Sequence, residues 1–135
     1  MIPKFRAWKT IGTNEMFHNV VAISWNNNKI AVLYPNPGRN TFRIDEESLE
    51  NVILMQSTSL KDKNGVEIFE GDVVITSKGA IGYVAYLQQE AGFVVVLKKS
   101  DYRLGHRNTG ESYDVATAHE VIGNIYENSE LLEVE

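Results

Sequence analysis

The hydrophobic positions of this chain form short runs that are separated by turn residues. The runs are rich in β-branched and aromatic residues, and no long stretch shows the 3.6-residue spacing of an amphipathic helix. Short runs bounded by Gly, Asn, Asp and Ser predict brief strands joined by tight turns. We therefore predict a mainly β protein with strands at residues 17–23, 29–34, 41–44, 52–56, 73–76, 81–87, 93–97 and 120–126.

Two turn signals organise the first part of the chain. Three asparagines at 26–28 separate two apolar runs, and Asn tolerates positive φ better than most residues, so this segment predicts a hairpin. The segment 34–38 contains two prolines, which cannot donate to a strand ladder. It predicts an exposed loop before the strand at 41–44.

Local helical turns are expected at two places. Asp45 is a suitable N-cap for residues 45–50, where Glu46 and Glu47 fall in the first turn. Ser129 is a suitable cap for a terminal turn at 129–132. Both turns are short, so they do not change the fold class.

The second part of the chain contains more closely spaced reversals. Asn64-Gly65 predicts a two-residue hairpin with a type I′ turn, which needs positive φ at both central positions. Asp72 after Gly71 predicts a turn in which the carboxylate accepts backbone N–H groups. Short strands cannot each bury a face alone, so we expect them to curl into a small barrel or a packed pair of sheets. The polar segment 103–112 is expected to be the most mobile loop.

Composition limits the chemistry that the chain can perform. It has 135 residues, no Cys, and a formal net charge of −5. The absence of Cys excludes thiolate zinc sites, iron–sulfur clusters and a cysteine nucleophile. The longest apolar run, 93–97, is far too short to span a bilayer, and residues 1–9 lack a signal-peptide core. We therefore expect a soluble, cytoplasmic protein without disulfides or membrane contact.

Charge is distributed unevenly along the chain. Residues 1–43 hold six basic side chains and one acidic one, a net charge of +5, whereas residues 44–135 hold seven and seventeen, a net charge of −10. Either the two parts attract one another, within a subunit or across an oligomer interface, or the basic part binds nucleic acid through phosphate contacts and base stacking. The candidate nucleic-acid-binding residues are Lys4, Arg6, Trp8, Lys9, Arg39 and Arg43.

No motif in the chain points to catalysis. The three His residues are far apart and form no metal-binding spacing, and neither a glycine-rich phosphate loop nor a nucleophile elbow is present. Residues 62–65 begin like a calcium loop, but Gly65 comes at the fourth position instead of the sixth. We predict a non-enzymatic protein with no catalytic residue, no metal site and no cofactor.

Three blocks of sequence resemble a known family. Residues 4–8, 54–74 and 121–132 are similar, in the same order, to blocks of the YopX-like family of bacteriophage and prophage proteins. Together they span nearly the full chain. Two departures are Ser59, where the family usually has Gly, and Ser129, where it usually has Pro.

The resemblance implies a phage-derived, cytoplasmic, mainly β protein that contains an SH3-like barrel and self-associates. We assign an N-terminal β-hairpin region to residues 1–56 and the SH3-like barrel to residues 57–135, with a single intertwined domain over 1–135 as the alternative. The predicted function is that of a non-enzymatic accessory protein that forms homo-oligomers and binds a host or phage protein. The alternative is nucleic-acid binding through the barrel and the basic N-terminal segment.

Overall fold

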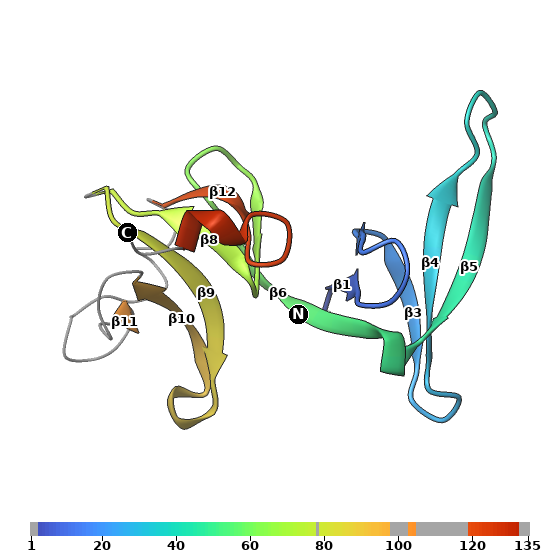
Figure 1. Cartoon of the computed structure of the whole chain (residues 1–135), viewed down its shortest axis with the longest axis horizontal. Helices are drawn as coiled ribbons and strands as arrows, with labels where there is room; N and C mark the ends of the chain where they lie inside the picture. Colours follow the sequence, from blue (N-terminus) through green and yellow to red (C-terminus); the bar gives the residue numbers. More distant parts are fainter. Residues whose placement is uncertain (1–2, 78, 98–102, 105–118, 133–135) are drawn as a thin grey trace. The chain divides into compact units, whose positions relative to one another are not determined.

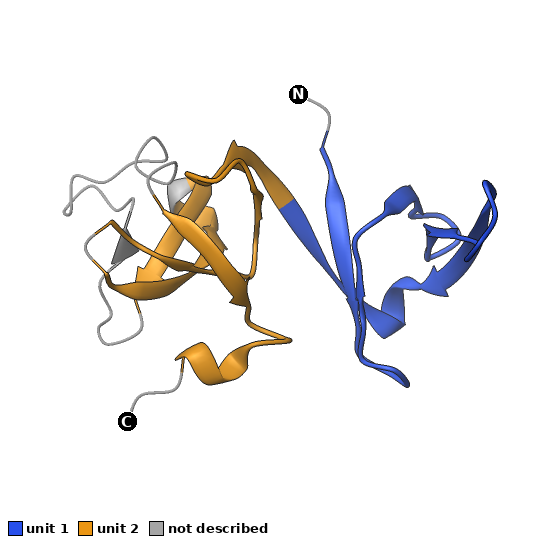
Figure 2. Cartoon of the chain, turned by 90° about the horizontal axis from the view of Figure 1, so that it is seen from above, with its two compact units in different colours: residues 1–56 blue, residues 57–135 orange. Residues whose placement is uncertain are grey.

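The computed structural model describes residues 3–77, 79–97, 103–104 and 119–132. Strands dominate these residues, and the helical segments among them are short 3-10 turns (Figure 1). The prediction of a mainly β protein is confirmed. The chain divides into two compact units, residues 1–56 and residues 57–135 (Figure 2). No helical segment within the described ranges has the length and apolar content that a bilayer crossing requires.

The first unit contains the antiparallel strands β1 (Phe5–Lys9), β2 (Met16–Phe17) and the beginning of β6 (Val52–Lys61). β1 lies in the middle, so that Ala7 pairs with Phe17 on one side and with Leu54 on the other. The predicted single strand at 17–23 is therefore wrong. The chain leaves this sheet after Phe17 and enters a different sheet at Val20.

The second sheet of this unit has the order β3-β4-β5 and is antiparallel throughout. The hairpin at 26–28 is confirmed, with Asn28 at a φ of 58°. A loop also precedes β5 as expected, and the Asn36 N–H donates to the Thr41 carbonyl across it at 2.9 Å. The three strands are β3 (Val20–Ser24), β4 (Lys29–Pro35) and β5 (Phe42–Ser48).

The helical turn predicted for residues 45–50 is wrong in its start and in its cap. Asp45 lies inside β5, where it pairs with Val32. The 3-10 turn η1 covers only Leu49–Asn51, and its cap is Ser48, whose Oγ accepts the Glu50 N–H at 3.3 Å. Pairing with β4 supplies backbone hydrogen bonds along the whole segment, and it outweighs the local preference of the acidic residues for a helix start.

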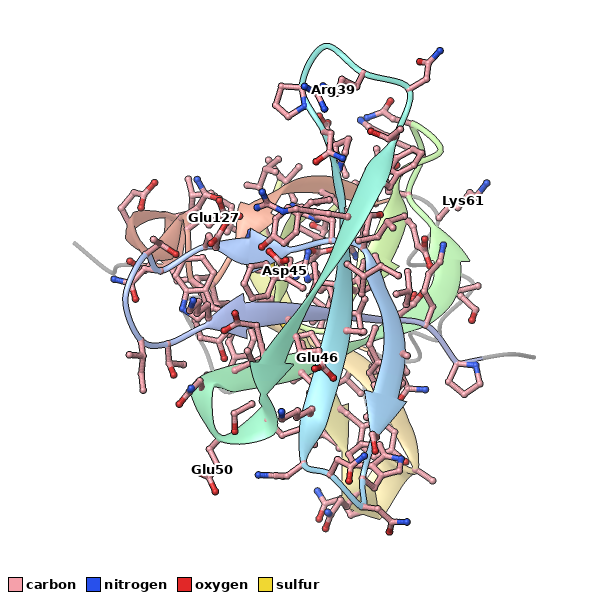
Figure 3. The ribbon with its side chains drawn as sticks, turned by 90° about the vertical axis from the view of Figure 1, so that its right-hand side faces the viewer. Arg39, Asp45, Glu46, Glu50, Lys61 and Glu127 are labelled. Atoms are coloured by element: carbon pink, nitrogen blue, oxygen red, sulfur yellow. The ribbon has the colours of Figure 1, made fainter. Side chains whose placement is uncertain are left out.

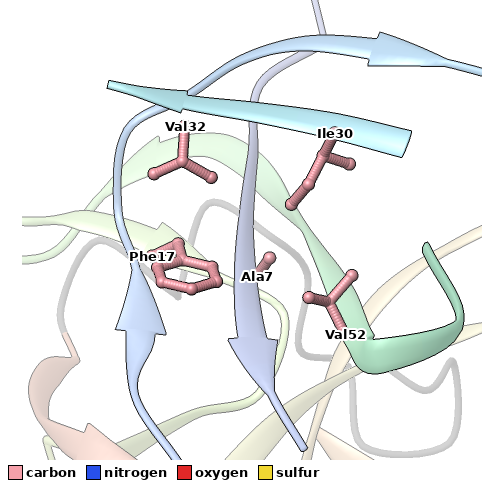
Figure 4. Packing of buried hydrophobic residues seen from close by; sticks show 5 residues of the cluster. All are labelled: Ala7, Phe17, Ile30, Val32 and Val52. Atoms are coloured by element: carbon pink, nitrogen blue, oxygen red, sulfur yellow. The ribbon is translucent and has the colours of Figure 1, made fainter. Parts of the chain in front are cut away.

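The core of the first unit lies between its two sheets. It contains Ala7, Phe17, Ile30, Val32 and Val52, each no more than 9% exposed (Figure 4). Phe17 also meets Tyr34 edge to face, with ring centroids 6.0 Å apart. Since side chains alternate along a strand, β4 turns Ile30, Val32 and Tyr34 toward this core and its other residues away from it.

The second unit is built on a curled five-stranded antiparallel sheet in the order β11-β10-β9-β8-β12 (Figure 1). Its core contains Ile68, Val74, Val84 and Val95. The strands predicted at 73–76, 81–87 and 93–97 are confirmed to within one residue at each end. The strands after β6 are β7 (Glu67–Phe69), β8 (Asp72–Ile75), β9 (Ile81–Leu87), β10 (Gly92–Leu97), β11 (Arg103–Leu104) and β12 (Glu120–Asn124). The SH3-like assignment of residues 57–135 stays a prediction.

The ends of the second unit differ slightly from expectation. β12 stops at Asn124 because its side-chain oxygen accepts the N–H groups of Tyr126 and Glu127, at 3.0 and 2.8 Å, and so turns the chain. The terminal helical turn is confirmed as η3 (Ser129–Leu132), but Ser129 is its first residue and not its cap. A further 3-10 turn, η2 (Gln88–Glu90), joins β9 to β10. Most of the loop predicted at 103–112 lies outside the described residues.

The hairpin at Asn64-Gly65 is confirmed, but its type I′ turn is wrong. Gly65 has a φ of +82°, whereas Asn64 is not among the residues with positive φ. The Gly65 N–H donates to the Asp62 carbonyl at 3.0 Å, and the Asp62 N–H donates to the Val66 carbonyl at 2.8 Å. This is the longer hairpin loop in which one left-handed glycine closes the turn. The Asp62 side chain selects it by accepting two N–H groups of the loop.

The strand β6 has an unusual backbone conformation at Ser59. This residue has a φ of +67°, a conformation that glycine adopts without strain. The pairing of β6 with β7 is irregular between Ser57 and Lys61. The Thr58 hydroxyl donates to the Ile68 carbonyl at 2.7 Å, and the Ser57 hydroxyl donates to the Glu67 carboxylate. This chain therefore bends at Ser59, where the resemblance to the YopX-like family leads us to expect Gly.

Candidate interaction surface

The structure separates the six residues predicted to bind nucleic acid. Arg6 and Trp8 lie on β1, and Arg6 is only 5% exposed, opposite Met55 of β6. Lys9 has the opposite orientation on the same strand, since successive side chains alternate. Its Nζ lies 3.2 Å from Glu47 of β5, with both side chains largely buried.

Arg43 is engaged by neighbours on its own sheet. Its guanidinium lies over the Tyr34 ring, 4.9 Å from the centroid, and its Nε is 3.3 Å from Asp45 Oδ2. Burial raises the pKa of Tyr34, and the negative charges of Glu15, Asp45 and Glu47 raise it further. Lys4 is exposed on the segment before β1. Arg39 is exposed on the β4–β5 loop, where Figure 3 labels it.

Two of these contacts are ion pairs between the basic part and the acidic part of the sequence. Lys9 and Arg43, from the basic first part, pair with Glu47 and Asp45, from the acidic second part, within one compact unit. The first of the two interpretations, attraction between the parts within a subunit, therefore applies to these two pairs. The prediction that the six residues bind nucleic acid stays untested.

The side of the β3-β4-β5 sheet that faces away from the core is apolar and accessible. Leu33 pairs with Ile44, and Pro35 pairs with Phe42, so these side chains lie on one face of the sheet. Phe42 is 64% exposed and Ile44 is 61% exposed. We call this surface the outer face, and it comprises Ala22, Ala31, Leu33, Pro35, Phe42, Ile44 and Glu46.

Further exposed apolar side chains lie on the same sheet. Val21, at the bulge of β3, is 52% exposed, and Trp25, in the β3–β4 turn, is 68% exposed. Single exposed apolar residues are ordinary on protein surfaces, but a cluster on one sheet is typical of an interaction site. On the outer face, Phe42 and Ile44 are grouped in this way with Leu33 and Pro35.

Sequence reasoning missed this surface because alternation alone does not tell which face is buried. In β5 the apolar residues Phe42 and Ile44 alternate with Arg43, Asp45 and Glu47. In such a strand the apolar residues are usually expected to face the core. Here the charged set faces the core side, where Arg43 covers Tyr34 and Glu47 pairs with Lys9. The one sequence feature that could have indicated this surface is the position of Phe42 and Ile44 just after an exposed loop.

Two carboxylates of the second unit, Asp62 and Asp72, have structural roles. Asp62 is 6% exposed; its Oδ1 accepts the N–H groups of Asn64 and Val66, both at 2.8 Å, and its Oδ2 accepts the Val121 N–H at 2.9 Å. Burial acts to raise the pKa of Asp62, but these backbone hydrogen bonds and the nearby Lys63 outweigh it and hold the pKa below its usual range. Asp62 therefore remains ionised and fastens the β6–β7 hairpin to β12.

Asp72 acts in the same way, as the sequence predicted. Its Oδ2 accepts the Phe69 N–H at 2.8 Å, and Gly71 before it has a φ of +89°. Of the histidines, His18 is exposed and His119 is buried, while His106 lies outside the described residues. Among the described residues no group of three or more His, Asp or Glu side chains is arranged to hold a metal ion.

Comparisons with known proteins agree with this fold over its full length. The family model described as YopX protein matches residues 4–133. The crystal structure of protein EF1440 from Enterococcus faecalis is 34% identical, covers 98% of this chain and 99% of its own, and superposes with a TM-score of 0.63. The comparison with curated proteins gives no significant match. The match of the family model over nearly the whole chain shows that this protein belongs to the YopX family.

Proposed function

We propose that this protein is a phage-derived accessory protein that acts by binding other proteins, without catalysis, in the cytoplasm of its bacterial host. It associates with copies of itself and with a host or phage protein. The observation that carries the proposal is the outer face of the β3-β4-β5 sheet, where Phe42 and Ile44 are more than half exposed. Burial of apolar area stabilises such side chains by roughly 25 cal/mol per Å², which favours an occupant on this face.

The polar residues support the same proposal. The side chains of Asp62 and Asp72 accept backbone N–H groups that shape turns. Their roles are those of a scaffold. Nucleic-acid binding remains the alternative from the sequence, and the exposed members of its candidate set are Lys4, Arg39 and Arg43.

Self-association predicts a mass above that of one chain. Light scattering of the intact protein at micromolar concentration should give a multiple of the chain mass. Phe42→Ser combined with Ile44→Ser should reduce it to one chain, because the outer face loses its two most exposed large side chains. Val66→Ser, at a 47% exposed position in the second unit, is the control and should leave the mass unchanged.

Two results would count against the proposal. A wild-type protein that scatters as a single chain up to high concentration would remove self-association. A double variant with the mass of the wild type would show that the outer face is not part of the interface.

A further inference from the structure

The β5 strand is an open sheet edge that carries several charged side chains. In the described part of the chain β5 pairs with β4 only, and no strand follows it on the other side (Figure 1). It is seven residues long and has no proline, lysine or bulge, but four of its residues are charged: Arg43, Asp45, Glu46 and Glu47. An open edge can pair with another chain, and charged side chains on it disfavour most partners but allow a partner of complementary charge.

The register of β4 and β5 shows which backbone groups point outward. The Leu49 N–H donates to Asn28 O and the Asn36 N–H donates to Thr41 O, each at 2.9 Å, at the two ends of the ladder. Hydrogen-bonded pairs alternate with non-bonded pairs in an antiparallel ladder. Arg43, Asp45 and Glu47 therefore direct their backbone groups toward β4, and the even-numbered residues Phe42, Ile44 and Glu46 direct theirs to the free edge.

We propose that two copies of this chain pair antiparallel through their β5 edges, in the register that places Ile44 opposite Ile44 of the second copy. This inference deepens the proposed function and rests on its self-association. The pairing joins two three-stranded sheets into one six-stranded sheet. The backbone groups of Phe42, Ile44 and Glu46 become hydrogen-bonded, and the outer faces of both copies become continuous.

Charge complementarity selects this register and identifies a second copy as the occupant. With Ile44 opposite itself, Arg43 of each copy lies opposite Asp45 of the other, so the interface gains two pairs of opposite charge. In the register shifted to residue 43, Arg43 would lie opposite Arg43 of the second copy. In the register shifted to residue 45, Asp45 would lie opposite Asp45 of the second copy. Like charges directly opposite each other destabilise a strand pair. The side chains of Arg43 and Asp45 are 60% and 45% exposed, which leaves them accessible to a partner.

Two charge reversals test the register. Arg43→Asp alone places two aspartates opposite each other, and Asp45→Arg alone places two arginines opposite each other. Each single variant should self-associate about tenfold or more weakly than the wild type, because both cross-strand pairs become repulsive. An equimolar mixture of the two variants should regain association, since every facing pair in the mixed dimer is then Asp with Arg. Light scattering of each sample gives the result, with circular dichroism to show that each variant is folded.

The mixture separates pairing between chains from the contact within one chain. In each single variant, residues 43 and 45 of the same chain carry like charges, and mixing does not change that. Only contacts between chains can restore association. Single variants that associate like the wild type, or a mixture that stays dissociated, would overturn the edge pairing but leave self-association through the outer face intact. A wild type that is monomeric would overturn both.

Discussion

Asp62→Ala is expected to lower the free energy of unfolding of residues 57–135 by about 3 kcal/mol, because a buried carboxylate that accepts three backbone N–H groups is lost. The three donors remain in place without an acceptor in a largely buried environment. Two of them shape the β6–β7 turn, and the third, Val121, belongs to β12. The variant should therefore loosen both the β6–β7 turn and its attachment to β12.

Denaturant unfolding followed by two probes measures this effect. Both tryptophans, Trp8 and Trp25, belong to residues 1–56, so their fluorescence reports the first unit, while far-UV circular dichroism reports both. The circular dichroism midpoint should fall. Glu130→Ala removes an exposed carboxylate from the same unit and should change stability by less than about 0.5 kcal/mol. Equal midpoints for Asp62→Ala and Glu130→Ala would contradict the role of Asp62.

Asp62 also predicts a pH dependence with a definite sign. Its folded-state pKa is lower than the ordinary value of 3.8, so the unfolded chain binds the proton more readily. The contribution of Asp62 is therefore complete above about pH 4 and is lost as the pH falls through the folded-state pKa. The stability difference between wild type and Asp62→Asn should be constant near neutral pH and shrink at lower pH. A difference that grows on acidification would show the opposite linkage.

Gly82→Ala is expected to destabilise the second unit by about 3 kcal/mol, because the added methyl group has no space. Gly82 lies in β9, opposite Val74 on one side and Leu97 on the other. A Cβ at this position would lie 2.5 Å from the Val96 carbonyl oxygen and 2.9 Å from Val95 Cγ1. The carbonyl belongs to β10, so it moves only if the β9–β10 ladder is disturbed.

Gly65→Ala is the matched control for this substitution. Nothing lies within 4 Å of the position of its Cβ, and the change has only the cost of a positive φ of +82°, about 1 kcal/mol. Thermal unfolding followed by circular dichroism compares the two variants in the same unit. If Gly82→Ala unfolded at the same temperature as Gly65→Ala, steric contact with β10 would not be the reason for glycine at position 82.

The sequence predicted correctly those turns and strands that are indicated by neighbouring residues in the chain. Asparagines at 26–28 and the glycine at 65 mark hairpins by their own backbone preferences, and the strand at 81–87 stands out between two turns. The strand β6 was longer than predicted because its polar centre, Ser57-Thr58-Ser59, does not look like a strand. In the folded protein, hydrogen bonds to Glu67 and Ile68 satisfy the hydroxyl groups of Ser57 and Thr58. Such partners lie ten residues away and are not visible in a local pattern.

The candidate site was less predictable for the same reason. The sequence shows Arg6 as a charged residue near a tryptophan, and only the sheet reveals that it is buried opposite Met55. It also shows Phe42 and Ile44 as apolar positions, which usually means a core. Their exposure depends on which face of the β3-β4-β5 sheet meets Ala7 and Phe17 of the other sheet, and this is decided by tertiary packing.

Residue-resolved amide hydrogen exchange of the intact protein at low and high concentration tests the central claim most directly. The account predicts that the N–H groups of Phe42, Ile44 and Glu46 exchange rapidly in dilute protein and slowly in concentrated protein, as a second chain covers the strand edge. The N–H groups of Arg43 and Asp45 point toward β4 and provide internal controls that stay protected at both concentrations. Rapid exchange at all three edge positions in a sample that light scattering shows to be associated would contradict the account.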